Sequence, residues 1–173
     1  MTVPTFRTAL IQGANRGLGL ELARQLASEG TRVFGTCRHP DSAGALRQVT
    51  PDVLRLLRHE RRAVLANLSA RVGSIEDNRL GGWYGYRASK AAQNMLTKTM
   101  AIELKRKAKN VIVLALHPGT VDTGLSGPFQ RNVPEGKLFS VERAARQLLA
   151  IVAKADEAHH GTFRAWDDTP IPW

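Results

Sequence analysis

Cysteine is nearly absent from this sequence of 173 residues, because Cys37 is the only one. A single cysteine excludes an intrachain disulfide, and such a chain fits the reducing conditions of the cytoplasm, where we expect this protein to reside. We interpret Cys37 as a buried strand residue rather than a nucleophile.

Long apolar runs are also missing from the sequence. No stretch approaches the roughly 20 apolar residues that a bilayer span requires. Residues 1–7 contain no basic segment followed by a long apolar stretch and a small-residue cleavage site. We therefore expect neither a membrane partner nor export.

Acidic and aromatic residues are few: 15 Asp and Glu face 25 Lys and Arg, for a net charge of +10, and aromatics make up 6%. Such a charge can attract nucleic acid. The densest basic segments, 55–62 and 105–109, have no interleaved aromatic residues that could stack on bases. We expect no nucleic-acid partner, and a salt-sensitive DNA binder is the weaker alternative. His159 and His160 are adjacent rather than at ligand spacing, so we predict no metal site.

The length and a hydrophobic fraction of 43% predict one domain over residues 1–173. The mostly apolar segment 8–11 is typical of a strand covered on both faces. Apolar residues then recur at helical spacing from Gly17 to Gly30, and 32–37 has the pattern of a second strand. Residues 7–38 therefore predict a strand, a glycine turn, a helix and a strand, which is a βαβ unit.

Strands and helices continue to alternate along the rest of the sequence. We predict a helix that begins at Thr50, Pro51 and Asp52, strands over 63–68, 111–116 and 162–166, and helices over 84–107 and 140–153. In the long helix, we expect Ala88, Ala91, Met95 and Ile102 to form the buried stripe. The alternation predicts a three-layer, mostly parallel α/β sheet of the Rossmann type.

A glycine-rich segment joins the first predicted strand to the first predicted helix. Its glycines allow a tight turn and close backbone approach, so that amide groups and the helix dipole can hold a pyrophosphate. The alternative is a glycine turn that binds no ligand. The candidate contacts to a dinucleotide are Gly13, Asn15, Arg16, Gly17, Leu18 and Gly19.

Arg38 follows the second predicted strand, where an NAD site normally has an acidic residue. With Arg16, it can offer guanidinium donors to the 2′-phosphate of NADP. We therefore predict NADP rather than NAD as the cofactor, with two solvated surface arginines as the alternative.

Tyr86 and Lys90 lie four residues apart in the predicted long helix, which places both side chains on one helix face. A nearby ammonium favours the phenolate, so we expect Lys90 to lower the pKa of Tyr86 from its usual value near about 10. Such a tyrosine can exchange a proton with a carbonyl or hydroxyl oxygen. An exposed pair without chemistry is the alternative.

The glycine turn, the Tyr86 to Lys90 helix and the segment 117–123 after a strand together resemble the short-chain dehydrogenase/reductase family. Segments 71–78, 81–84 and 166–173 are similar to the group of C-factor and sniffer-type carbonyl reductases. The resemblance implies NADP-dependent hydride transfer to or from a carbonyl or alcohol substrate. It also implies Tyr86 as general acid/base, Lys90 as holder of the nicotinamide ribose, and four residues beside the nicotinamide: Pro118, Gly119, Val121 and Thr123.

The sequence departs from the family after Arg38, where about two βα units, on the order of 60 residues, have no counterpart. The family's catalytic asparagine lies in the missing part. We expect the strands at 8–11 and 63–68 to pair directly in a shortened sheet of about five strands. The alternative is that a partner covers the opened edge of the sheet. A catalytically impaired nucleotide-binding or signalling remnant of the same fold is the alternative function.

The family serine that holds the substrate oxygen is also missing, because Ala70 stands in its place. Ser74 and Ser69 are the substitutes, and we rank Ser74 first because Ser69 would face the other side of a continuing strand. Loop capping is an equally good explanation of both serines. Family members commonly pair through their long helices, so a homodimer is a possible assembly.

Overall fold

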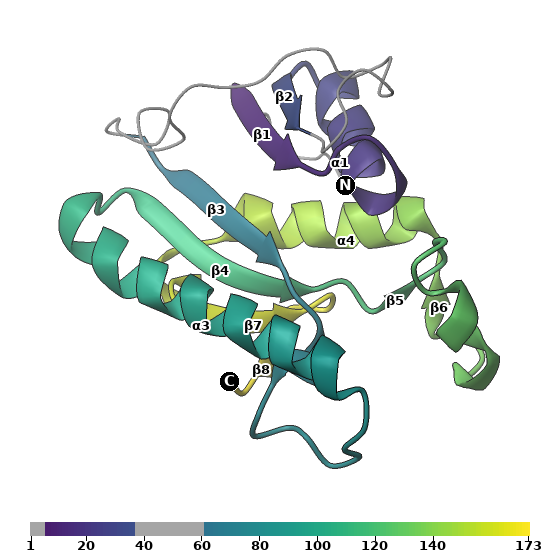
Figure 1. The fold of residues 1–173 in the computed structure, drawn as a ribbon. Helices are drawn as coiled ribbons and strands as arrows, with labels where there is room; N and C mark the ends of the chain where they lie inside the picture. The colour runs from purple at the N-terminus through teal and green to yellow at the C-terminus, as the bar shows by residue number, and fades with distance from the viewer. Residues whose placement is uncertain (1–5, 37–60) are drawn as a thin grey trace. The chain divides into compact units, whose positions relative to one another are not determined.

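The computed structural model describes residues 6–36 and 61–173. The chain divides into two compact units, one of Met1–Asp52 and Gly119–Ala153 and the other of Val53–Pro118 and Lys154–Trp173. Figure 1 labels the helices and strands of both units. The single domain over 1–173 stays a prediction.

The first unit opens with the predicted βαβ arrangement, drawn in purple and blue in Figure 1. Strand β1 (Thr8–Gln12) and strand β2 (Arg32–Thr36) pair in parallel, and helix α1 (Gly17–Ser28) connects them and packs on both. The strand, glycine turn, helix and strand predicted from 7–38 are therefore confirmed as far as Thr36.

The remainder of the first unit contains two very short parallel strands, a 3-10 helix and one long helix. Their bounds are β5 (Thr120–Val121), the 3-10 helix η3 (Gly127–Asn132), β6 (Leu138–Phe139) and α4 (Val141–Lys154). Helix α4 matches the helix predicted over 140–153, and its buried residues recur at helical spacing. Two-residue strands are too short to produce a periodic pattern, so the sequence did not predict β5 and β6.

The second unit contains a four-stranded sheet in the order β3-β4-β7-β8. Its strands are β3 (Ala63–Leu68), β4 (Val111–His117), β7 (Thr162–Ala165) and β8 (Pro170–Ile171). The first three run parallel and β8 runs antiparallel to β7. Central strand β4 is buried along 111–116, as expected for an apolar strand with neighbours on both sides.

Helix α3 (Tyr84–Lys107) has the bounds predicted from the sequence and packs on β4, with the 3-10 helix η2 (Arg71–Gly73) against it. Near its C-terminal end, Ala101 and Leu104 join Val111 and Val113 in an apolar core. A second 3-10 helix, η4 (Glu157–His159), precedes β7.

The stripe predicted to be buried in α3 was wrong. Met95 is 66% exposed and Ile102 is 58% exposed. The buried positions are instead Asn94, Thr97, Ala101 and Leu104. Polar side chains occupy the buried face because β3 and its end offer partners: Asn67 donates to Thr97 at 3.0 Å, and Ser69 donates to Asn94 at 2.6 Å.

The described strands form three separate hydrogen-bonded sheets of two, four and two strands. The fold is a mostly parallel, shortened α/β arrangement, as predicted. Strand β1 pairs with β2 and β3 pairs with β4, and the expected pairing of 8–11 with 63–68, which would join the two units, stays a prediction. The helix predicted from Thr50 and the strand residue Cys37 lie outside the described residues. Within the described ranges, no helix is long and apolar enough to cross a bilayer.

Candidate active site

The turn between β1 and α1 requires glycine at three positions. Gly13 and Gly17 have φ values of +71° and +54°, in the region that favours glycine. Gly19 has no room for a side chain, because a Cβ there would collide with the carbonyl oxygen of Gly13 and lie 3.3 Å from Cα of Ala14. The backbone of the turn is therefore packed tightly against the first turn of α1.

The N-terminus of α1 offers its amide groups to a ligand. Arg16 precedes the helix in an extended conformation without a side-chain cap, and the first turn contains no acidic residue. Amides in the first turn of a helix lack intrahelical partners and carry the positive end of the dipole, which suits a phosphate. Asn15 and Arg16 are exposed beside these amides, and Leu18 is half-buried.

Thr123 lies next to this turn in the same unit. A Cβ placed on Gly17 would be 3.8 Å from Cγ2 of Thr123. Ser126 holds the Thr123 loop, because its hydroxyl donates to the carbonyl of Val121 at 2.5 Å and accepts from the amide of Thr123 at 3.3 Å. Thus the glycine turn and the Thr123 loop, which the sequence analysis predicted separately as cofactor-binding segments, lie next to each other.

The other residues predicted to contact the nicotinamide or the 2′-phosphate do not all lie in this unit. Val121 is buried in β5, and Gly119 has a φ of +79° that favours glycine. Pro118 belongs to the second unit, directly after β4. Arg38 lies outside the described residues.

Tyr86 lies in the first turn of α3 and is 45% exposed. Partial burial raises the pKa of its phenol above the usual value, which contradicts the lowering expected from Lys90. At neutral pH this side chain is therefore a protonated phenol that can donate a proton.

The Lys90 side chain is hydrogen-bonded at the end of β3. Its Nζ donates to the carbonyl of Leu68 at 3.2 Å and to Oε1 of Gln93 at 2.9 Å. Burial lowers the pKa of the Lys90 ammonium. Gly73 packs directly on the Lys90 backbone, since a Cβ there would be 2.7 Å from the Lys90 carbonyl carbon.

Ser69 and Ser74 are both buried, at 4% and 2% exposure. The Ser69 hydroxyl donates to Asn94, as described above. The Ser74 hydroxyl accepts from the amide of Asp77 at 3.0 Å and donates to the carbonyl of Trp173 over a long 3.5 Å. Ser74 therefore acts as a loop cap in this structure, and its donor bond is the weaker of the two.

The sequence analysis did not predict His117 as a site residue, although it directly precedes Pro118 at the end of β4. Its Nδ1 is buried without a hydrogen-bond partner among the described residues. Burial lowers the pKa of His117 to about 4, with a smaller contribution from the positive charge of Arg71, while Asp167 opposes the shift. The imidazole is therefore neutral at the carboxyl edge of the sheet, where α/β folds bind ligands.

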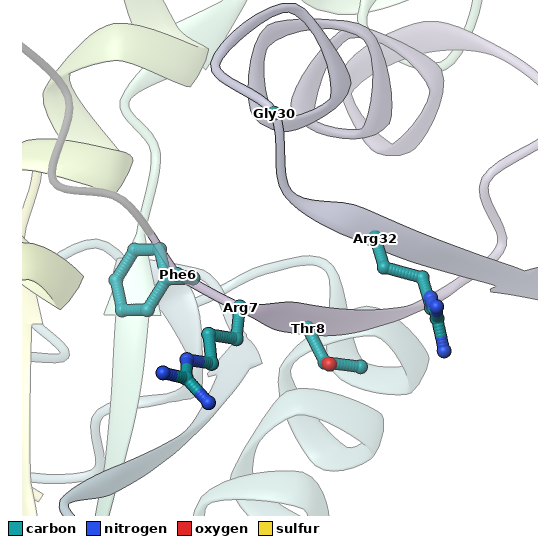
Figure 2. Close-up of a pocket in the computed structure, with 5 residues that line it drawn as sticks. All are labelled: Phe6, Arg7, Thr8, Gly30 and Arg32. Atoms are coloured by element: carbon teal, nitrogen blue, oxygen red, sulfur yellow. The ribbon is translucent and has the colours of Figure 1, made fainter.

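A pocket of about 470 Å³ lies elsewhere, at the amino end of β1 (Figure 2). Its lining contains none of the predicted site residues. No cluster of three or more metal-ligating side chains occurs in the ranges 6–36 and 61–173.

Comparison with known proteins identifies the relationship of this chain. A sequence model of the family described as short chain dehydrogenase matches residues 43–134. The chain is 32% identical to the C-signal protein of Myxococcus xanthus over 133 residues, which cover 77% of this chain and 74% of that protein. It is also 23% identical to an uncharacterized oxidoreductase of Schizosaccharomyces pombe in an alignment of 252 positions covering 98% of this chain and 99% of the relative. This alignment is longer than the chain, in agreement with a missing internal segment.

Solved structures share the fold. An NADPH-bound carbonyl reductase from chicken fatty liver matches with a TM-score of 0.78 and 22% identity, covering 98% of this chain and all of that one. The carbonyl reductase Sniffer of D. melanogaster matches with a TM-score of 0.76 and 21% identity, covering 97% of this chain and all of that one. At these identities the likeness establishes the architecture.

Proposed function

This chain belongs to the short-chain dehydrogenase family, whose members are oxidoreductases, and we propose that it transfers a hydride between NADP and a carbonyl or alcohol substrate. The observation that carries the proposal is the tight glycine turn, with Gly19 packed on Gly13 and Thr123 beside Gly17. Tyr86 and Lys90 on α3 are proposed to supply the proton and the contact to the nicotinamide ribose.

The residues of the glycine turn fit the cofactor. A side chain at Gly19 would push the turn away from the helix, and an acid in the first turn of α1 would repel a pyrophosphate; neither is present. Arg16 and Arg38 are proposed to bind the 2′-phosphate. The chicken carbonyl reductase, which shares the fold, was solved with NADPH bound.

Bound NADPH would supply the hydride that reduces the substrate carbonyl carbon. Tyr86 is proposed to deliver the proton to the carbonyl oxygen, which its protonated phenol suits in the direction of reduction. An ammonium has three donors, and two of those of Lys90 serve Leu68 and Gln93. The third is proposed to hold the nicotinamide ribose, with Pro118, Gly119, Val121 and Thr123 next to the ring.

Ser74 is the serine proposed to bind the substrate oxygen. Its donor bond to Trp173 is 3.5 Å long, whereas Ser69 donates to Asn94 at 2.6 Å. A weak bond can be exchanged for one to a substrate at lower cost than a strong one.

The test is an NADPH titration followed by turnover with a panel of aldehydes and ketones. We expect NADPH to bind more tightly than NADH and to be consumed. Tyr86→Phe should abolish turnover and leave NADPH affinity unchanged. Equal affinity for the two cofactors would refute the NADP assignment, and an unchanged rate in the variant would refute the role of Tyr86.

A nucleotide-binding remnant without catalysis is the second candidate, and one observation favours it. Both candidate serines already have partners for their hydroxyl protons inside the fold. Tight NADPH binding with no consumption across the whole panel would support the remnant and exclude the reductase.

A homodimer is the assembly that we propose, with α3 as the contact. Large apolar side chains are exposed along this helix, among them Tyr84, Met95, Leu96 and Ile102. Exposed apolar patches of this kind mark interaction surfaces. Sedimentation should give twice the chain mass, reduced to the monomer by Ile102→Lys; a monomeric wild type would exclude the pairing.

The single cysteine supports residence in the cytoplasm.

A further inference from the structure

The pocket at the amino end of β1 is basic and has no role in the proposed reaction. Phe6, Arg7, Thr8, Gly30 and Arg32 line it (Figure 2). We propose that it binds a small phosphate monoester that carries an aromatic or apolar group.

Strand pairing brings the main chains of the two arginine-bearing segments together. Thr8 and Arg32 are register partners across the β1–β2 ladder, and the amide of Arg32 donates to the carbonyl of Arg7 at 3.1 Å. In Figure 2 the side chains of Arg7, Thr8 and Arg32 extend toward the same side of β1. The ladder fixes the main chain that carries both arginines, so a ligand need not order the main chain on binding.

The two charges are not neutralised within the described ranges. No hydrogen bond or ion pair joins either guanidinium of Arg7 and Arg32 to another side chain of residues 6–36 and 61–173, whereas Arg24 pairs with Glu21 at 3.1 Å and Arg71 with Asp77 at 2.9 Å. A phosphate has enough oxygens to accept from two planar guanidinium groups at once.

The remaining lining residues point to the rest of the ligand. The Thr8 hydroxyl is a further donor between the arginines (Figure 2). The half-buried Phe6 ring provides an apolar wall. Gly30 leaves open space, since a Cβ there would meet nothing within 4 Å. A volume of about 470 Å³ is within the range of small-molecule sites.

This site is distinct from the glycine turn. The pocket lies at the first residue of β1, and the turn follows the last. Five residues of strand separate them by about 16 Å. Gly30 also follows the C-terminal end of α1, where the helix dipole is negative and attracts cations. Arginines that served only this helix end would contribute stability without binding a ligand.

The experiment is calorimetric titration of the protein with phenyl phosphate and with inorganic phosphate at low salt. We expect phenyl phosphate to bind several-fold more tightly than inorganic phosphate, because of Phe6. The double variant Arg7→Gln/Arg32→Gln should lose at least about tenfold in affinity for phenyl phosphate. Arg24→Gln, on the same unit but paired with Glu21, should bind like the wild type.

Arg16→Gln separates this site from the cofactor site. It should weaken NADPH binding and leave phenyl phosphate binding unchanged. The inference is overturned if wild type does not bind phenyl phosphate, if the double variant binds it normally, or if Arg16→Gln abolishes binding. A lower melting temperature of the double variant with unchanged affinity would assign the arginines to the helix end and also overturn it.

Discussion

Ser69 donates its hydroxyl proton to Oδ1 of Asn94 at 2.6 Å, and both side chains are buried. Ser69 directly follows Leu68, whose carbonyl accepts from Lys90, and Asn94 lies one helical turn after Lys90. The pair therefore ties α3 to the end of β3 at the level of the candidate catalytic lysine.

Replacement of this hydroxyl should destabilise the protein. In Ser69→Ala, Oδ1 of Asn94 loses its partner, and its Nδ2 already has none among the described residues. An unsatisfied buried polar atom costs about 1–3 kcal/mol. We expect a loss of this size in urea unfolding. Ser89→Ala removes an exposed hydroxyl from the same helix and should change stability by less than about 0.5 kcal/mol.

The same variant tests the ranking of the two serines. If Ser69→Ala eliminates turnover while its unfolding free energy stays at the wild-type value, Ser69 is the serine that binds the substrate oxygen. In that case the preference for Ser74 is wrong.

Gly73 should tolerate no side chain. In Gly73→Ala the new Cβ would lie 2.7 Å from the Lys90 carbonyl carbon, so η2 must move away from α3. We expect destabilisation of about 1–3 kcal/mol, the usual cost of overpacking, and a fall in turnover through displacement of Lys90. Gly85→Ala is the matched control, because its Cβ meets nothing and a helical alanine should stabilise by up to about 1 kcal/mol. Equal melting temperatures for the two variants would contradict the contact.

The glycine turn gives a test of cofactor binding within one unit. Gly19→Ala should weaken NADPH binding at least about tenfold, because the Cβ displaces the Gly13 carbonyl and with it the amides at the start of α1. Gly124→Ala places its Cβ in open space and should bind NADPH like the wild type. Fluorescence titration measures both. Wild-type affinity in Gly19→Ala would show that NADPH does not use this turn.

Regular elements could be predicted from the sequence because their patterns are long. The bounds of β3 and α3 match the prediction, and β4 is as buried as its apolar residues indicate. The buried face of α3 could not be predicted by the same means. Apolar periodicity assumes that polar residues face solvent, whereas Asn94 and Thr97 are buried through hydrogen bonds to β3 and its end. The buried face of α3 is therefore identified only from its packing against β3 in the folded structure.

The sequence predicted that Tyr86 and Lys90 share one face of a helix, but not the hydrogen bonds or pKa values of these two residues. The spacing of Tyr86 and Lys90 correctly predicts that they lie one turn apart on α3. It does not predict the two acceptors that bind the Lys90 ammonium. Those acceptors come from β3 and from Gln93, and burial raises the Tyr86 pKa instead of the expected lowering. His117 escaped notice because a single histidine before Pro-Gly has no spacing pattern, and its burial becomes visible only in the sheet.

His117 should make stability depend on pH. Its pKa is lowered from 6.5 to about 4 in the folded protein, so between these values the unfolded chain binds more protons than the folded one. The stabilising contribution is therefore complete above about pH 6.5 and is lost as the pH falls toward 4, by up to about 3 kcal/mol. Urea unfolding at pH 7.0 and 4.5 measures the loss. His117→Gln cannot titrate and should lose less stability over this range, with the carboxylates acting equally in both proteins. Identical losses in wild type and variant would show that the imidazole is not held neutral by burial at the end of β4.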